Sequence, residues 1–110
     1  MKEARIILPL SGNEGQSVEQ VHSALKRKLA LEFGGFTAVP AFGGWVNPKG
    51  ELVEEAVYVY DIGCSDVPKR DADAASEALV RIAKWACEAA DQVCVYVKDF
   101  SGEVSLVYAR

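Results

Sequence analysis

Histidine and paired cysteines are scarce in this 110-residue chain. His22 is its only histidine, and Cys64, Cys87 and Cys94 show neither CxxC nor metal-type spacing. We therefore expect no metal site and no other cofactor, and the odd number of cysteines indicates free thiols in a reducing compartment. No hydrophobic run reaches the length of a transmembrane helix, and the first residues lack the features of a signal peptide. These absences predict a cytoplasmic protein.

An excess of basic residues is also missing. Twelve Lys and Arg stand against sixteen Asp and Glu, which gives a formal net charge of −4. Nucleic-acid backbones are bound by clustered positive charge, so this balance argues against such a partner. Tyr58 and Tyr60 on one strand are typical of the stacking aromatics of an RNA-binding sheet, but they have no basic companions. Nucleic acid is therefore an unlikely partner on sequence grounds, and a membrane is not expected.

What the chain does have is an ordinary globular composition. Half of its residues are hydrophobic and a quarter are charged. That composition, at this length, predicts one domain over residues 1–110, with a core that needs no metal or disulfide to hold it.

The first third of the chain predicts a strand followed by an amphipathic helix. Residues 5–10 form a short apolar run typical of a buried strand. Ser17 and Gln20 have the spacing of a capping box at a helix start, and Gly34 with Gly35 would end that helix. Its apolar positions recur every three or four residues: Val18, Val21, Leu25, Leu29 and Phe33. His22 lies beside this stripe, so we expect a residue at the core boundary rather than a catalytic base.

The next segment, residues 36–46, is predicted to be irregular. Pro40, Gly43 and Gly44 interrupt a run that would otherwise suit a strand. Two interpretations of this segment stay open: a structural staple of glycines with Trp45 as an aromatic plug, or a lid formed by residues 38–44 over a small pocket.

A strong turn and the clearest strand of the chain follow. Residues 47–50 read Asn-Pro-Lys-Gly, which is the composition of a tight turn. Residues 52–62 alternate, with Tyr58 and Tyr60 on one face and valines on the other.

The rest of the chain completes an α+β pattern. We expect a loop at 64–70, a helix that begins at Asp71 or Asp73, and strands at 93–97 and 104–108. The order strand, helix, strand, strand, helix, strand, strand is typical of a ferredoxin-like two-layer sandwich, βαββαβ, with one extra C-terminal strand. Two helices would then cover one face of an antiparallel sheet. Because the strands are apolar on both sides, we expect the uncovered face to pair with a second copy in a homodimer.

Short glycine-containing motifs between Leu29 and Tyr60 carry a resemblance. They are Phe33-Gly34-Gly35-Phe36-Thr37, Gly43-Gly44-Trp45, Gly50 and Glu54-Glu55. This pattern resembles that of small bacterial and bacteriophage proteins of similar length with no assigned activity. The resemblance implies an α+β fold of this size and transfers no catalytic residue.

The same region supplies the candidate site. The turn at 47–50 would fold the glycine-rich segment back onto the following strand, and we expect a ligand or partner to bind where they meet. The residues concerned are Phe36, Thr37, Gly43, Gly44, Trp45, Glu54 and Tyr58. Since no catalytic set is evident, the first hypothesis is a non-enzymatic binding module that engages a protein or a small molecule. The alternative is a small enzyme that uses Glu54 or Glu55 with Thr37, and with His22 from a neighbouring subunit.

Overall fold

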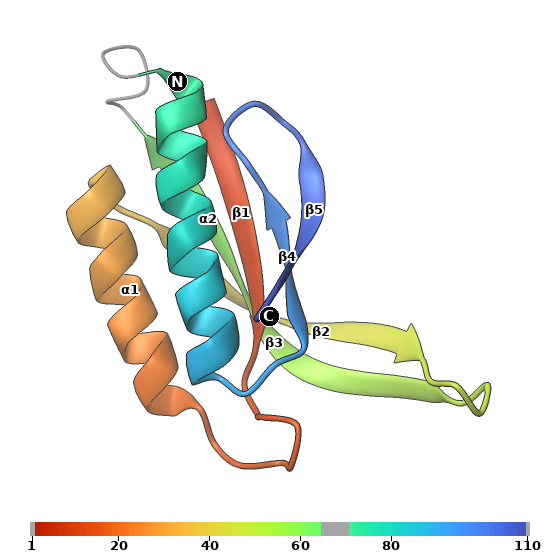
Figure 1. Ribbon diagram of the computed structural model, residues 1–110. Helices are drawn as coiled ribbons and strands as arrows, with labels where there is room; N and C mark the ends of the chain where they lie inside the picture. The colour runs from red at the N-terminus through yellow and green to blue at the C-terminus, as the bar shows by residue number, and fades with distance from the viewer. Residues whose placement is uncertain (1, 65–70, 110) are drawn as a thin grey trace.

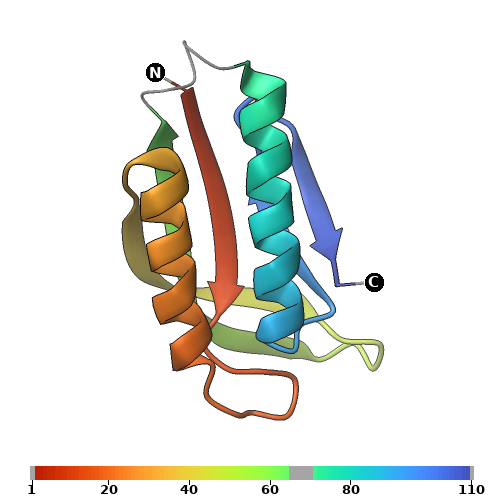
Figure 2. The same ribbon diagram turned by 60° about the vertical axis from the view of Figure 1, so that its left-hand side comes forward.

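A computed structural model describes residues 2–64 and 71–109. Two helices pack on one face of a five-stranded antiparallel sheet with strand order β2-β3-β1-β4-β5 (Figures 1 and 2). The elements are β1 (Lys2–Pro9), α1 (Glu19–Phe33), β2 (Thr37–Val46), β3 (Leu52–Cys64), α2 (Ala72–Ala89), β4 (Cys94–Lys98) and β5 (Val104–Tyr108). The predicted ferredoxin-like sandwich with an added C-terminal strand is confirmed. Cys64 ends β3, and the rest of the expected loop at 64–70 lies outside the described residues.

The helix ends follow local chemistry with one exception. Gly34 closes α1 with a φ of 91°, and its amide donates to the Ala30 carbonyl. The Asp71 side chain caps α2 by accepting from the amide of Asp73 at 2.8 Å. The capping box predicted at the start of α1 is wrong: Val18 is the N-cap residue and no side chain caps it. The Ser17 hydroxyl accepts only a long bond, 3.4 Å, from the Glu19 amide.

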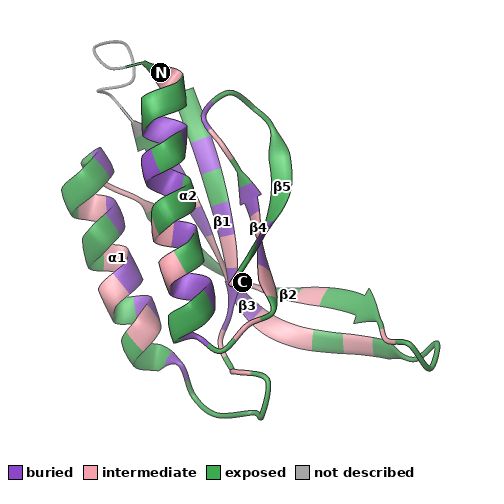
Figure 3. Cartoon of the chain, viewed as in Figure 1, coloured by how far each residue is buried: buried purple, intermediate pink, exposed green. Residues whose placement is uncertain are grey.

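The core lies between the helices and the sheet (Figure 3). Each strand contributes alternate residues to it, as the pleat requires. The largest fully buried side chains come from both layers: Tyr60, Phe33, Ile6, Leu8, Leu25, Leu29, Ile62 and Leu79. The apolar stripe predicted for α1 is therefore its buried face.

The prediction of an irregular segment at 36–46 is wrong. β2 is a continuous strand that pairs with β3 from Thr37↔Asp61 to Val46↔Leu52. Pro40 is tolerated because β2 is at the edge of the sheet, where a missing backbone donor need not break a ladder. Residues 38–44 are consequently part of a sheet and do not form a lid.

The β2–β3 hairpin extends beyond the rest of the sheet. β1 pairs with β3 only as far as Pro9↔Val57, and the Leu10 amide adds one bond to the Ala56 carbonyl. Residues 42–56, called the arm below, therefore project as a two-stranded ribbon (Figure 1). No residue of the arm is buried. Its tip is the predicted turn, where the Gly50 amide donates to the Asn47 carbonyl at 2.9 Å.

Within the described part of the chain, neither helix is long and apolar enough to span a membrane.

Candidate functional site

His22 lies inside the core, not at its boundary as predicted. Only 2% of its surface is exposed. Its Nε2 lies 2.7 Å from the Pro9 carbonyl oxygen and its Nδ1 lies 2.5 Å from the Tyr60 hydroxyl. A carbonyl can only accept, so Nε2 carries the proton and Nδ1 accepts from Tyr60. Burial lowers the pKa of His22, as does the neighbouring Lys26, against the raising effect of the Pro9 carbonyl. The imidazole is thus neutral, and both its nitrogens are already bonded.

Tyr58 and Tyr60 lie under the helices rather than on an open sheet face. Their register partners on β1 are Leu8 and Ile6, both buried. Tyr60 is fully buried, and its burial raises its pKa. Tyr58 meets the His22 ring edge-on, with the ring centroids 5.4 Å apart. Neither ring lies on the open sheet face, where an RNA-binding sheet would carry its stacking aromatics, which removes the sequence argument for such a sheet.

A polar hollow of about 320 Å³ lies beside this cluster, where the arm leaves the body. It is lined by Leu10, Ser17, Glu19, His22, Ser23, Lys26 and Tyr58. The Lys26 ammonium stands 5.0 Å from the centre of the Tyr58 ring, a cation–π distance. The hollow therefore offers one positive group, one negative group, two serine hydroxyls and a tyrosine side chain within one small volume.

Helix geometry explains why these side chains converge. Glu19, His22, Ser23 and Lys26 are three or four residues apart and share one face of the first two turns of α1. This spacing is visible in the sequence. What the sequence does not show is that Tyr58, thirty-two residues after Lys26, completes the hollow.

The arm continues from the hollow. Glu54 and Ala56 project from the same face of β3 as Tyr58, because side chains alternate along a strand. Gly44 lies opposite Glu54, and Phe42 lies opposite Ala56. The Cα atoms of Glu54 and Tyr58 are thus about 13 Å apart along the strand.

The structure divides the residues expected to form one site. Thr37 pairs with Asp61, whereas Gly44 pairs with Glu54, so Thr37 and Glu54 are seven positions apart, or roughly 23 Å. Phe36 packs against Tyr60 with ring centroids 6.1 Å apart. Within one chain, therefore, Thr37 cannot act together with Glu54.

The remaining expected residues lie on the arm. Glu55, Gly43 and Trp45 project from the face opposite to Glu54. Gly43 and Gly44 are ordinary strand residues: an added Cβ would meet its nearest neighbours at 3.6 Å and 3.5 Å, normal contact distances.

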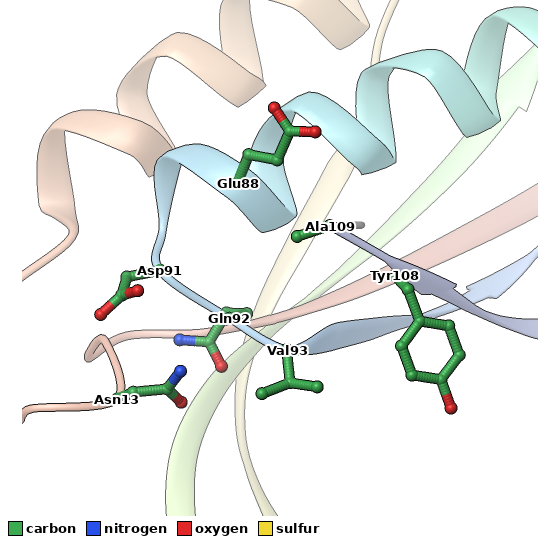
Figure 4. A pocket seen from close by; sticks show the side chains of 7 residues that line it. All are labelled: Asn13, Glu88, Asp91, Gln92, Val93, Tyr108 and Ala109. Atoms are coloured by element: carbon green, nitrogen blue, oxygen red, sulfur yellow. The ribbon is translucent and has the colours of Figure 1, made fainter.

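A second hollow, of about 520 Å³, lies at the C-terminal end of α2 (Figure 4). Its lining is Asn13, Glu88, Asp91, Gln92, Val93, Tyr108 and Ala109. Several of these polar groups are engaged within the chain: Gln92 donates to the carbonyls of Ser11 and Ala90, and Asp91 accepts from Gln16 at 3.1 Å. The acidic groups are not balanced by any basic residue in the lining.

Two solved structures share the fold. The chain is similar to a phage SAM lyase in complex with S-methyl-5′-thioadenosine, with a TM-score of 0.73 and 17% identity over 96% of this chain and 88% of that one. It is also similar to a phage SAM lyase in the apo state, with a TM-score of 0.69 and 19% identity over 98% and 89%. No family model and no curated protein sequence matches the chain. At these identities the match shows the fold.

These neighbours contradict the first hypothesis about function. They are enzymes, and they match this chain over almost its whole length. A non-enzymatic binding module is therefore the wrong main interpretation, and the alternative of a small enzyme agrees better with the finding.

Proposed function

We propose that this chain is a lyase that cleaves S-adenosylmethionine and releases S-methyl-5′-thioadenosine. The observation that carries the proposal is the near-complete structural match to a SAM lyase that holds this thioadenosine. Fold alone does not give function, so the site must also suit the substrate. We propose that it acts in the cytoplasm, where the free thiol of Cys87 would remain reduced.

The hollow beside α1 supports the proposal by its chemistry. The substrate has a carboxylate, an ammonium group, a sulfonium and ribose hydroxyls. Lys26 would bind the carboxylate and Glu19 the ammonium group, while Ser17 and Ser23 would take ribose hydroxyls. The second hollow has no basic residue in its lining for the carboxylate.

The Tyr58 ring would take the sulfonium. Its face already holds the Lys26 ammonium at 5.0 Å, which supports a cation site there. When substrate binds, the sulfonium would replace the ammonium over the ring, and Lys26 would turn to the substrate carboxylate. A volume of about 320 Å³ is at the small end of ligand pockets. The rest of the substrate would accordingly extend along the arm toward Glu54.

The bond that breaks joins the sulfonium sulfur to Cγ of the amino-acid part. Both of its electrons go to sulfur, which becomes a neutral thioether. Cγ then needs another electron pair. The substrate carboxylate can supply it by attacking Cγ, or the Cβ–H bond can supply it if a base removes the proton. The first route needs only a held substrate. The second needs a base within reach of Cβ, and Glu54, about 13 Å from Tyr58 along β3, lies too far from the sulfonium to serve, so we favour the first route. Neither route needs water or an oxidant.

The test is incubation of the purified protein with S-adenosylmethionine, followed by chromatography and mass spectrometry for the thioadenosine. A buffer blank is required, because the sulfonium also decomposes slowly in water. We expect thioadenosine above the blank, and a loss of at least tenfold in rate for Tyr58→Ala. Glu88→Gln, in the second hollow, is the control and should retain the full rate. A folded protein that produces no more than the blank contradicts the proposal.

A further inference from the structure

The sheet face opposite the helices has one row of apolar residues that crosses all five strands. The register places Val39, Val59, Ile7, Tyr96 and Leu106 side by side in one row from β2 to β5. All five project away from the helices, because their neighbours along each strand face the core. At the two edges, Val39 is 46% and Leu106 is 53% exposed. A continuous apolar row of this kind is rare on the surface of a soluble monomer.

The adjacent row is polar but nearly self-neutralised. It contains Thr37, Asp61, Arg5 and Lys98 in register order. The Arg5 guanidinium donates to the Asp61 carboxylate at 2.8 Å. A partner for this face must therefore be apolar along one row and need not bring a large opposite charge to the next.

The arm extends the same surface. Trp45 and Val53 pair with each other and project from the side of the hairpin that carries Val57 and Val59. Trp45 is 51% exposed although it is the largest side-chain type. Since the arm has only two strands and no helix cover, the chain itself has nothing with which to bury this ring.

We infer that a second copy of this chain covers the open sheet face, with its own open face and arm as the contacting surfaces. A second copy supplies the matching apolar row, and the row beside it, with Arg5 and Lys98 against Asp61, carries a net charge of only +1. Symmetric self-association is also the commonest assembly of soluble chains. This inference does not depend on the proposed lyase activity.

The available area agrees with a stable contact. Five strands about 4.8 Å apart and about five residues long make a surface of roughly 400 Å² in projection, and the two-stranded arm adds roughly 150 Å². The accessible area of such a surface exceeds its projection because side chains roughen it. It therefore approaches the ~800 Å² per partner that is typical of specific interfaces.

The first experiment is light scattering on the purified chain at high micromolar concentration. We expect a mass of two or more times 11.9 kDa. Leu106→Glu and Val39→Glu place a charge on the apolar row and should give monomers that remain folded by circular dichroism. Leu31→Glu is the matched control: Leu31 is 77% exposed on α1, in the other layer, and its substitution should not change the mass. A monomeric parent, or assemblies that survive both row substitutions, would overturn the inference.

Trp45 gives a second readout. In Trp85→Phe, Trp45 is the only tryptophan left, since the chain has two. We expect its emission to move to longer wavelength on dilution, as the ring passes from the interface into water. Unchanged emission across the dissociation measured by light scattering would show that the arm does not take part.

Discussion

His22 joins Tyr60 of β3 to the end of β1 through two short hydrogen bonds, 2.5 Å from Nδ1 to the Tyr60 hydroxyl and 2.7 Å from Nε2 to the Pro9 carbonyl. Because α1 carries the imidazole, these bonds fix the helix against both central strands just beside the polar hollow. A buried hydrogen-bonded pair of this kind holds one arrangement more firmly than apolar packing alone.

Tyr60→Phe tests this connection. The substitution leaves Nδ1 of His22 buried without a donor, which costs about 1–3 kcal/mol. Urea unfolding followed by circular dichroism should show this loss. Tyr58→Phe is the control, because no hydrogen bond of the Tyr58 hydroxyl occurs among the described residues, and it should cost much less. Equal losses for the two variants would mean that the His22 bond contributes nothing special.

The stability of the fold should depend on the protonation of His22. Its pKa is lowered below the ordinary 6.5, chiefly by burial. The unfolded chain therefore takes up a proton at higher pH than the folded one. The stabilisation is complete above about pH 7.5 and declines as the pH falls through 6.5 and below. Urea unfolding at about pH 7.5 and about pH 5.5 should show this decrease in the parent and not in His22→Gln.

Substitution of Gly34 at the end of α1 should lower the free energy of unfolding, whereas substitution of Gly35 should not. Gly34 has a φ of 91°, whereas Gly35 has no positive φ. Gly34→Ala should therefore cost about 1 kcal/mol of unfolding free energy. An added Cβ meets nothing within 4 Å at either position, so Gly35→Ala controls for everything except backbone conformation. A similar cost at both positions would contradict the assignment of the cap.

The element order was predictable because each helix and most strands have their own local signal. The apolar residues of α1 recur with the period of a helix, and those of β3 alternate with the period of a strand. The turn at 47–50 is predicted by its residue composition. β2 was missed because Pro40, Gly43 and Gly44 are read locally as breaks. Only the neighbouring strand shows that they occupy a sheet edge, where such residues are allowed.

The candidate site was harder to predict, for a related reason. The burial of His22 depends on Tyr60, which is thirty-eight residues away. A pattern read in a short stretch of sequence cannot include both residues. Thr37 and Glu54 were expected together because a short hairpin would have joined them. The length of β2 instead places them at opposite ends of the hairpin. The spacing of Glu19, Ser23 and Lys26 on one helix face was a usable signal that pointed to the hollow.

The Arg5–Asp61 ion pair on the open sheet face should contribute more to self-association than to the stability of an isolated chain. Arg5 and Asp61 side chains are 45% and 43% exposed, so in an isolated chain the pair contributes at most about 1 kcal/mol. In an interface, removal of one partner leaves an unpaired charge that is no longer hydrated. Asp61→Ala should thus weaken self-association by at least tenfold, and Arg5→Ala combined with Asp61→Ala should recover part of it. Sedimentation equilibrium measures both. No difference between single and double variants would place the pair outside the interface.

Lys26 should distinguish substrate from product. In the proposed complex it binds the carboxylate of S-adenosylmethionine, a group that the thioadenosine lacks. Lys26→Gln should therefore raise the KM for the substrate about tenfold, which corresponds to about 1.4 kcal/mol. Inhibition by added thioadenosine should not weaken, because that molecule has no carboxylate for the ammonium group to bind. A general disturbance of the hollow would weaken both ligands together, and Lys26→Arg, which keeps the charge, should restore most of the substrate affinity. If Lys26→Gln weakened the thioadenosine as much as the substrate, the carboxylate would have to bind elsewhere.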